Sequence, residues 1–423
     1  MSFFKKYFKG DPHIWAIIVG LSVFSLLAVY SSTGTMAYLY KGGNTAIYII
    51  RHSGFLAFGL SVAFILHMLP NKYYRISRWL IVIIIPLLVF TLFFGVDENE
   101  ATRRIPIFGL TFQTSDLAKM VLIMHLADRL VIWQKEIRNF KKTLLPLFFI
   151  IGLVCALIVP ANFSTAAMLF GVCVILLFVG GASKRQLSAL CAITLMLGAL
   201  LVSGLYGLHQ VGVKNNAKQG SIYINNVTQR GVTIVNRIDR FIGNNPEDDS
   251  LGKNYQAKQA KIAVGTGGFF GKGPGNSVQR NFLPHPYSDF IFAIIIEEYG
   301  IIFGGIPLLF LYINLLSCSI QIVRKCDKTY PAFLVMGLSL SVVFQALVNM
   351  AVAVGLIPVT GQPLPFVSMG GTSMLFTGAA FGIILSVSRE QRRQEELQNR
   401  RTAEKKPTEP ESEQENEQEN EYV

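Results

Sequence analysis

The chain has 423 residues, of which 51% are hydrophobic and only 15% are charged. About 25% of the residues of a soluble globular protein are charged, so this composition excludes an ordinary soluble domain and favours a chain surrounded mostly by lipid. The formal net charge of +12 can indicate a nucleic-acid partner in a soluble protein. Here the basic residues lie in short segments between apolar runs, and no nucleic-acid-binding motif is found. We therefore expect membrane lipids, and no nucleic acid, as partners.

Long apolar runs recur along the chain, and about ten of them can be distinguished. They cover residues 14–31, 48–69, 79–96, 112–132, 144–160, 164–182, 186–206, 290–322, 332–356 and 371–388. A helix that crosses a bilayer needs about 20 apolar residues, and an open strand cannot satisfy its backbone in lipid. The sequence therefore predicts an all-α polytopic membrane protein with about ten transmembrane helices.

The lysines and arginines between these runs predict how the chain crosses the membrane. One set of connecting segments is basic and contains Lys5, Lys6, Lys9, Lys72, Arg75, Arg78, Lys135, Arg138, Lys141, Lys142, Lys184, Arg185, Arg324, Lys325, Lys328 and the arginine-rich stretch from Arg389. The alternate segments hold few cations before residue 207. The positive-inside rule then places both termini in the cytoplasm.

The same pattern predicts three parts of the chain. Residues 1–13 form a cytoplasmic N-terminal segment, and residues 14–388 form the ten-helix membrane domain. Residues 389–423 form a cytoplasmic tail that is polar, ends in an acidic stretch and is expected to be disordered. Within the membrane domain, residues 207–288 form one long extracytoplasmic loop between helices 7 and 8. Loops of that length usually carry function.

The stretch from residue 101 to residue 119 has two interpretations. Gln113 and Ser115 lie where a helix N-terminus is expected, so the stretch can be a capped helix whose Lys119 reaches to the membrane interface. It can equally be an anion site, because Arg103 and Arg104 offer guanidinium groups that bind phosphate and a helix N-terminus adds positive potential. A lysine inside an apolar run is costly and usually has a task. Spacing alone leaves both interpretations open.

Asp289 stands where the long loop meets an apolar run. One interpretation is a cap of the following helix, since Asp is among the best N-cap residues. The other is a general base at the membrane surface, and the two roles can coexist. Glu297 and Glu298 follow about 12 Å deeper at about 1.5 Å per residue, where buried carboxylates need partners. For these two we favour structural ion pairs or hydrogen bonds.

Glycines and prolines interrupt the chain at two further places. Residues 255–264 can form an amphipathic helix on the membrane, and the glycine-rich residues 265–275 follow. The glycines predict either a flexible linker or backbone that approaches a ligand closely, and they do not match the P-loop pattern. Residues 355–373 break what would otherwise be a helical hairpin. Such a break is tolerated where it is packed in protein or lines a cavity, so a re-entrant turn and a cavity floor are the two interpretations.

Taken together, these segments resemble one known family, the SEDS proteins (shape, elongation, division and sporulation), over residues 12–390. The matching pieces are RR…FQTSDLAK at 103–119, PANFSTA at 160–166, YQAKQAKIAVGTGGFFGKGPGNS at 255–277, FLPHPYSDFIFAIIIEEYG at 282–300 and GLIPVTGQPLPFVSMGGTS at 355–373. Four pieces depart from the family pattern. Ala161-Asn162 stands where the family often has Pro-Asp, and Met369-Gly-Gly-Thr-Ser373 stands where it has Tyr-Gly-Gly-Ser-Ser. Thr114-Ser115-Asp116 stands where the family commonly has Pro-Ser-Glu, and His285-Pro-Tyr-Ser288 stands where it commonly has Glu-Ala-His-Thr. The aspartate that follows is retained as Asp289.

The resemblance implies a peptidoglycan glycosyltransferase at the outer face of the bacterial inner membrane. Its substrate would be lipid II, an undecaprenyl-pyrophosphate-linked disaccharide pentapeptide, and Asp289 would be the catalytic base of an inverting transfer. The candidate substrate-binding residues, with those for the pyrophosphate first, are Arg103, Arg104, Lys119, Lys272, Arg280, Gln113, Ser115, Gln259, Ser277, Ser368 and Thr372. A divalent cation, Mg2+ or Mn2+, would screen the diphosphate and could bridge to Asp289. No organic cofactor is expected.

The resemblance also suggests a cellular role. It favours the division branch of the family, with septal wall synthesis as the role and the division septum as the location, and the elongation branch is the neighbouring alternative. It implies a class B penicillin-binding transpeptidase and other division proteins as partners. Two other classes of function remain, a flippase or transporter of lipid II and a scaffold that only recruits the transpeptidase. A catalytic Asp289 would distinguish the enzyme from both.

Overall fold

The computed structural model describes residues 8–34, 38, 44–94, 96–98, 101–107, 110–214, 253–283, 285–326 and 328–404, with only the backbone described between residues 96 and 111. Residues 1–7, 215–252 and 405–423, which belong to the predicted N-terminal segment, long loop and tail, lie outside the described residues. The longer helices are α2 (Pro12–Ser32), α4 (Ala46–Met68), α5 (Ser77–Phe94), α6 (Thr114–Ile132), α7 (Leu145–Ile158), α8 (Phe163–Val179), α9 (Lys184–Lys214), α11 (Lys253–Gly267), α12 (Ile291–Gly300), α13 (Ile306–Lys325), α14 (Thr329–Ala353) and α15 (Gly371–Glu404).

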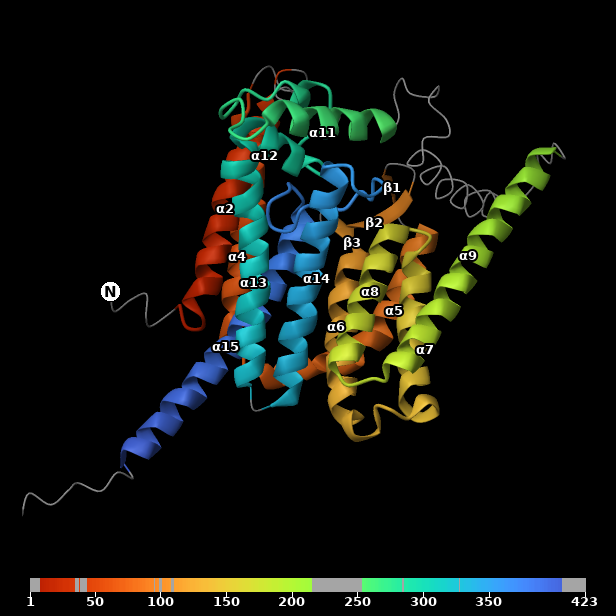
Figure 1. The fold of residues 1–423 in the computed structure, drawn as a ribbon, viewed down its shortest axis with the longest axis vertical. Helices are drawn as coiled ribbons and strands as arrows, with labels where there is room; N and C mark the ends of the chain where they lie inside the picture. Colours follow the sequence, from red (N-terminus) through yellow and green to blue (C-terminus); the bar gives the residue numbers. More distant parts are fainter. Residues whose placement is uncertain are drawn as a thin grey trace, which may run out of the picture.

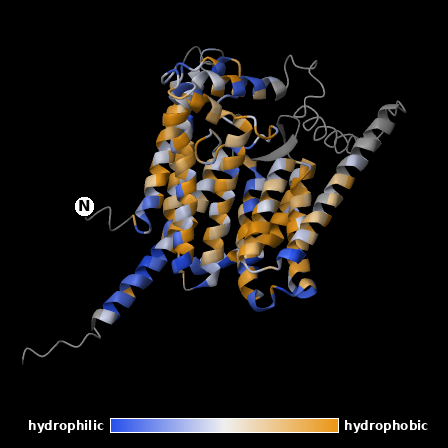
Figure 2. Cartoon of the chain, viewed as in Figure 1, coloured by the Kyte–Doolittle hydropathy of each residue, from blue (hydrophilic) through white to orange (hydrophobic). Residues whose placement is uncertain are grey.

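Most of these helices run roughly side by side in one bundle, with α11 lying across one end and α15 projecting from the other (Figure 1). Figure 2 shows hydrophobic residues along the bundle and hydrophilic residues on the projecting part of α15. Among the described residues, seven helical stretches are long and apolar enough to cross a membrane, namely Pro12–Ser32, Ala46–Met68, Asn71–Phe94, Phe140–Ile158, Ile291–Lys325, Thr329–Ala353 and Gly371–Thr402. α8 is apolar but shorter. The chain is therefore a helical membrane protein, and the count of about ten crossings stays a prediction.

Both ends of the membrane domain lie at the same end of the bundle. Asp11 caps α2 by accepting a hydrogen bond from the backbone N–H of His13 at 2.9 Å, and Arg392 on α15 lies 3.8 Å from the same carboxylate. Arg389 donates a hydrogen bond to the carbonyl oxygen of Met68, where α4 ends, at 2.8 Å. We call this end of the bundle the terminal end and the opposite end the distal end. The contacts confirm that α2 begins and α15 leaves the bundle on one side.

The all-α prediction is wrong between α5 and α6. Three short strands, β1 (Val96–Glu98), β2 (Ala101–Ile107) and β3 (Leu110–Gln113), form an antiparallel sheet in the order β1-β2-β3. β2 and β3 pair Ile105 with Phe112 and Pro106 with Thr111, and β-branched and aromatic residues favour strands. A connection outside the apolar runs can pair with itself, so it needs no helix to satisfy its backbone. β3 also takes the first two residues of the run predicted at 112–132, and α6 begins at Thr114.

The apolar run at 290–322 is not one continuous helix. α12 ends at Gly300, whose φ of +73° lies in the left-handed region, and a short π-helix (η5, Ile301–Gly305) leads into α13. A Cβ built on Gly304 would lie 3.0 Å from the carbonyl oxygen of Ile295, whereas nine residues of a straight helix span about 13.5 Å. The chain therefore folds back at Gly300, and α12 is the short arm of a helical hairpin. Hydropathy alone cannot reveal this reversal, because both arms are apolar.

Two polar segments are more helical than predicted. α11 covers the amphipathic helix expected at 255–264 and extends it at both ends. α15 continues to Glu404, so the disorder predicted from residue 389 does not begin there. Charged pairs support this extension, since Lys325 at the end of α13 lies 3.5 Å from Glu395 on α15. Such pairs stabilise a solvated helix by small amounts each.

The reversal at Gly300 generates a prediction about stability. Replacing Gly300 by Ala should lower the thermal unfolding temperature and cost more than about 2 kcal/mol, because a left-handed residue with a Cβ is itself unfavourable by about 1–2 kcal/mol and the Cβ would lie 2.3 Å from the carbonyl oxygen of Phe269. Gly54 in α4 is the matched control, since a Cβ there meets nothing within 4 Å. The Gly54→Ala variant should unfold at or above the wild-type temperature. Equal unfolding temperatures for the two variants would contradict the hairpin.

Candidate functional site

A buried polar cluster lies inside the distal half of the bundle, where an apolar interior would be expected. Asp116 and Lys119 on α6 are 7% and 8% exposed, and Gln345 and Asn349 on α14 are 6% and 1% exposed. The fifth member, Gln362, is 3% exposed and belongs to residues 354–370, which connect α14 to α15 and which we call the re-entrant segment. Polar groups at membrane depth are costly and usually functional. This cluster is therefore the candidate site.

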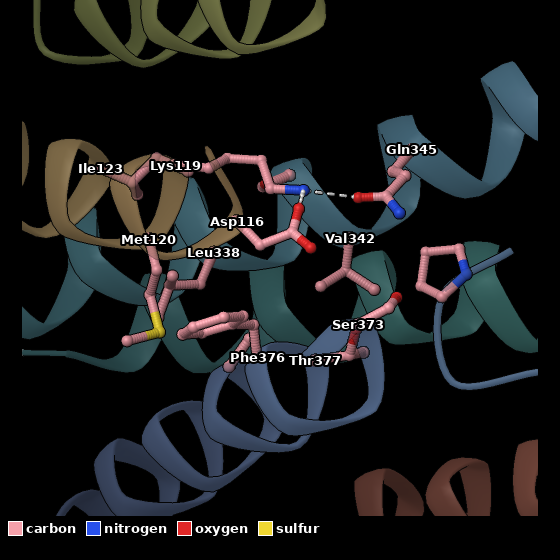
Figure 3. Close-up of a pocket in the computed structure, with 13 residues that line it drawn as sticks. Asp116, Lys119, Met120, Ile123, Leu338, Val342, Gln345, Ser373, Phe376 and Thr377 are labelled. Carbon is pink, nitrogen blue, oxygen red and sulfur yellow. Dashed lines mark hydrogen bonds and ion pairs between the residues drawn. The ribbon is translucent and has the colours of Figure 1, made fainter. Parts of the chain in front are cut away.

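The cationic end of Lys119 points into the bundle. Asp116 and Lys119 are three residues apart in the first turns of α6, which places them on one helix face. The Lys119 Nζ lies 3.2 Å from Asp116 Oδ1 and donates a hydrogen bond to Gln345 Oε1 at 2.8 Å (Figure 3). The interpretation in which Lys119 reaches to the membrane interface is therefore wrong. The structure holds a positive charge between α6 and α14.

A small cavity adjoins this ion pair. Asp116, Lys119 and Gln345 form its polar side, and Ser373 and Thr377 on α15 lie opposite (Figure 3). Apart from Ser341, apolar residues close the remainder. Its volume is about 30 Å³, which is room for roughly one water molecule. A sugar or a diphosphate can enter only if the re-entrant segment or α15 moves.

The side chains of α14 hold the re-entrant segment in place. Gln345 Nε2 donates to the carbonyl oxygen of Pro363 at 3.0 Å, and Asn349 Nδ2 donates to that of Gln362 at 2.7 Å. Gln362 in turn donates to Thr165 Oγ1 on α8 at 2.6 Å. Because prolines lack an N–H, this segment cannot form a regular helix, and its carbonyl groups need side-chain donors. The helix break predicted at 355–373 is packed in protein, and Pro365 and Ser373 also line the small cavity, so both interpretations of the break apply.

Three successive backbone carbonyls fix the position of Asp289. The carbonyl oxygen of Tyr287 accepts from the N–H of Met369 at 2.9 Å, that of Ser288 accepts from Ser368 Oγ at 2.7 Å, and that of Asp289 accepts from Asn349 Nδ2 at 2.7 Å. We call these three bonds the backbone clamp. Two of the donors belong to the re-entrant segment and the third to α14. The clamp therefore ties Asp289 to the same network that holds Lys119.

The carboxylate of Asp289 lies just before α12. The N-cap residue of α12 is Phe290, whose side chain makes no capping hydrogen bond. Asp289 is half-buried, and its Oδ1 accepts a hydrogen bond from Ser288 Oγ at 3.0 Å. A Cβ on Gly361, which has φ +67°, would lie 3.5 Å from its Oδ2, so the re-entrant segment passes close to the carboxylate. Asp289 therefore directly precedes the N-cap position of α12, and the base remains the functional hypothesis for this residue.

Glu297 and Glu298 instead organise the distal end of the bundle. Both are fully buried. Glu297 binds Lys272 Nζ at 2.6 Å and also accepts a hydrogen bond from Ser277 Oγ. Glu298 accepts from Ser31 Oγ on α2 and lies 4.0 Å from Arg280. The prediction of structural ion pairs for both glutamates is confirmed. Three candidate substrate-binding residues, Lys272, Ser277 and Arg280, thus bind these carboxylates.

The sequence predicts that Glu297 and Glu298 lie deeper in the bundle than Asp289, and the structure shows the reverse order. Glu298 is level with Ser31 at the distal end of α2. Ser288 instead contacts Ser368, whose neighbour Val367 accepts a hydrogen bond from Ser25. Ser25 and Ser31 are separated by about 9 Å along a helix. Asp289 therefore lies deeper in the bundle than the glutamates, because α12 rises toward the distal end before the chain reverses at Gly300.

The remaining candidates are spread around the cluster. Gln113 donates to Ser115 Oγ at 3.0 Å at the start of α6. Gln259 on α11 and Thr372 in the first turn of α15 are half-buried. The backbone of Arg103 and Arg104 lies in β2, and their side chains lie outside the described part of the chain. Among described residues, no group of three or more His, Cys, Asp or Glu side chains could hold a metal ion.

Sequence reasoning missed Gln345, Asn349 and Gln362. Gln345 and Asn349 are polar residues four apart within the apolar run at 332–356, and side chains at that spacing lie on one helix face. Their spacing was a usable signal for a polar helix face. Their partners could not be read from it, because those partners are distant in sequence.

Comparison with known proteins places the chain in a family. The family model described as "Cell cycle protein", for FtsW, RodA and SpoVE, matches residues 12–393. "Stage V sporulation protein E" of Bacillus subtilis is 32% identical over 391 residues, which are 91% of this chain and 99% of that protein. "Probable peptidoglycan glycosyltransferase FtsW" of Coxiella burnetii is 30% identical over 385 residues, which are 89% of this chain and 96% of that protein.

Solved structures share the fold. The rod shape determining protein RodA of Thermus thermophilus superposes with a TM-score of 0.62 at 22% sequence identity, covering 90% of this chain and 97% of RodA. A chain from "Structural coordination of polymerization and crosslinking by a peptidoglycan synthase complex" superposes with a TM-score of 0.63 at 24% identity, covering 90% of this chain and 98% of that one. The match in sequence over nearly the whole membrane domain, together with this fold, shows that the chain belongs to the FtsW, RodA and SpoVE family of cell cycle proteins, the SEDS family.

Proposed function

We propose that this chain is a peptidoglycan glycosyltransferase that polymerises lipid II at the outer face of the bacterial inner membrane. Relatives from Coxiella burnetii and Pseudoalteromonas translucida, each about 30% identical to this chain, carry the name probable peptidoglycan glycosyltransferase FtsW. The observation that carries the proposal is the backbone clamp, which fixes Asp289 in one hydrogen-bonded network with the buried Lys119. A fixed carboxylate near a buried cation is what the transfer of a sugar from a diphosphate requires.

The reaction forms one bond and breaks one bond. The 4-hydroxyl oxygen of a GlcNAc attacks the anomeric carbon of a MurNAc, and the bond from that carbon to undecaprenyl pyrophosphate breaks. Asp289 accepts the proton of the attacking hydroxyl, as the base does in inverting glycosidases. The pyrophosphate leaves with the electron pair, and a positive group stabilises its charge. Lys119 takes that role, with Arg103 and Arg104 as further candidates.

The residues around Asp289 supply only some of the ligands that a divalent cation needs. Asp289 is a single carboxylate with a serine hydroxyl beside it, and the described residues contain no larger cluster of ligands. Mg2+ is often held by one or two carboxylates together with substrate phosphates. Asp289 would therefore hold Mg2+ or Mn2+ only jointly with the diphosphate of lipid II. The cation, when bound, would neutralise charge on the leaving group.

The charge distribution supports an extracytoplasmic site. The basic connecting segments at 72–78, 141–142 and 324–328 belong to the terminal end of the bundle, where Lys325 also meets α15. By the positive-inside rule this end faces the cytoplasm. The distal end, with the glutamate contacts and α11, then faces outward. Asp289 then lies in the half of the bundle nearer the side on which glycan strands are assembled.

We assign the chain to septal wall synthesis with a transpeptidase partner. Several relatives are named FtsW, and a structural neighbour comes from a complex described as coordinating polymerization and crosslinking. A class B penicillin-binding transpeptidase would supply the crosslinking reaction. A location at the division septum and contacts with other division proteins belong to the same proposal.

Replacing Asp289 by Asn tests the base directly. The variant should fold normally, because an amide oxygen can still accept the Ser288 hydroxyl and the backbone clamp uses no carboxylate atom. Polymerisation of lipid II by the purified protein should fall by about 10²–10⁴-fold, the usual contribution of a general base. The assay measures glycan strand length and amount in liposomes containing lipid II.

Glu136→Gln is the matched control, since it neutralises an exposed carboxylate at the terminal end, and it should leave polymerisation unchanged. Normal activity of Asp289→Asn would remove Asp289 from the role of base. Translocation of lipid II by the wild-type protein without any polymer would identify a flippase instead.

The Lys119–Asp116 ion pair allows a test that separates charge from folding. Lys119→Gln alone leaves a buried carboxylate unpaired and should destabilise the protein by about 3–5 kcal/mol. The double variant Lys119→Gln/Asp116→Asn removes both charges and should recover most of the thermal stability without recovering polymerisation. Recovery of both properties in the double variant would show that Lys119 serves folding and not the pyrophosphate.

A further inference from the structure

A second cavity lies at the terminal end of the bundle, away from the candidate site. It has a volume of about 610 Å³, which is within the usual range for small-molecule sites of roughly 300–1,000 Å³. Its walls come from a 3-10 helix (η1, Asn71–Ile76), the first turn of α14 and the part of α15 around Gln391. Three elements distant in sequence thus meet around it.

Cations dominate the lining of this cavity. Among the described lining residues, Lys72, Arg75 and Lys328 contribute positive charges and Glu390 contributes the one carboxylate. No carboxylate in the described ranges forms an ion pair with Lys72 or Lys328. The cavity therefore carries an excess of positive charge.

Arg75 is only partly neutralised by its neighbour. Its Nε lies 3.6 Å from Asp128 Oδ1. Asp128 already accepts two hydrogen bonds from Arg78, at 3.1 and 2.8 Å. Because a guanidinium has five N–H donors, Arg75 retains donors for a ligand in the cavity.

The start of α14 adds to the positive potential. Lys328 is the N-cap residue of this 25-residue helix and makes no capping hydrogen bond through its side chain, and Thr329, Tyr330 and Pro331 of the first turn line the cavity. The first N–H groups of a helix lack partners within the helix, and the helix dipole favours an anion there. Lysines, an arginine and a helix N-terminus together form a site for a phosphate group.

The position of the cavity indicates the source of that phosphate. Tyr73 and Trp79, just beside the lining residues, are 56% and 72% exposed, and exposed aromatic side chains mark the membrane–water interface. Lys72 Nζ lies 5.2 Å from the centre of the Tyr73 ring. The cavity is thus at the level of lipid headgroups, where basic pockets between helices bind anionic lipids.

We propose that this cavity binds the phosphate of an anionic phospholipid headgroup on the membrane face at the terminal end of the bundle. A bound headgroup would tie η1, α14 and α15 together. α14 is also the helix that supplies Gln345 and Asn349 to the candidate site. The proposal does not depend on the polymerase reaction.

The test measures lipid binding by the full-length protein in detergent. Phosphatidylglycerol, zwitterionic phosphatidylcholine and inorganic phosphate are added in separate arms, and bound lipid is counted by native mass spectrometry together with the shift in unfolding temperature. Phosphatidylglycerol should bind and raise the unfolding temperature. Lys72→Gln/Lys328→Gln should weaken its binding by about tenfold or more, since each basic residue near a headgroup contributes about 1 kcal/mol.

Lys141→Gln/Lys142→Gln is the matched control, because it removes two exposed lysines from the same end of the bundle but outside the cavity. It should change binding by less than about twofold, in contrast to the effect expected from the lining lysines. Equal losses in the two double variants would show general surface attraction and overturn the proposal. Equal binding of phosphatidylglycerol and phosphatidylcholine would overturn it as well. Stabilisation by inorganic phosphate without any by phosphatidylglycerol would overturn the assignment to a lipid.

Discussion

The backbone clamp on residues 287–289 is the interaction on which the site depends. A chain that dips into a membrane protein must find a partner for every backbone carbonyl, because no bulk water is present there. The carbonyl groups of Tyr287, Ser288 and Asp289 find theirs on Met369, Ser368 and Asn349. The hydrogen bonds that satisfy these backbone carbonyls thus also determine where the Asp289 carboxylate lies.

The need for a partner also explains where the buried cations lie. Lys272 and Arg280 are positive groups close to the predicted catalytic segment in sequence, but they pair with Glu297 and Glu298 at the distal end. Lys119 is held deeper, by Asp116 and Gln345, beside a cavity. Two layers result, an outer layer of ion pairs that fixes α12 and α11 and an inner polar layer that holds Lys119 and, through the backbone clamp, Asp289. The inner layer adjoins a cavity that α15 also lines.

The sequence predicts the helices better than it predicts their paths. Every apolar run contains a helix, because length and hydropathy determine whether a segment can be helical in lipid. The reversal at Gly300 depends instead on one left-handed residue and on close packing of Gly304 against Ile295, neither of which hydropathy measures. That single error inverted the expected depths of Asp289 and Glu298. The sheet that carries the backbone of Arg103 and Arg104 was not predicted, because it lies mostly outside the apolar runs and hydropathy was used to find helices.

The site residues likewise divide into those that the sequence predicts and those that it does not. Asp289 and Lys119 were found because a charge in or beside an apolar run is conspicuous. Asn349 was missed because an uncharged amide in an apolar helix is not conspicuous. Its importance comes from its hydrogen bonds to two backbone carbonyl groups, which are 13 and 60 residues away in the sequence. Long-range partners of this kind require the folded chain.

The most direct test of the central claim removes the α14 part of the backbone clamp while leaving the carboxylate intact. Steady-state polymerisation of lipid II is measured for Asn349→Ala and for Ser339→Ala, a buried hydroxyl on the same helix that bonds only to Met336 of that helix, with unfolding temperatures recorded for both. Asn349→Ala should remain folded and lower kcat with little change in KM, while Ser339→Ala keeps the wild-type kcat. A folded Asn349→Ala variant with wild-type kcat would contradict the account.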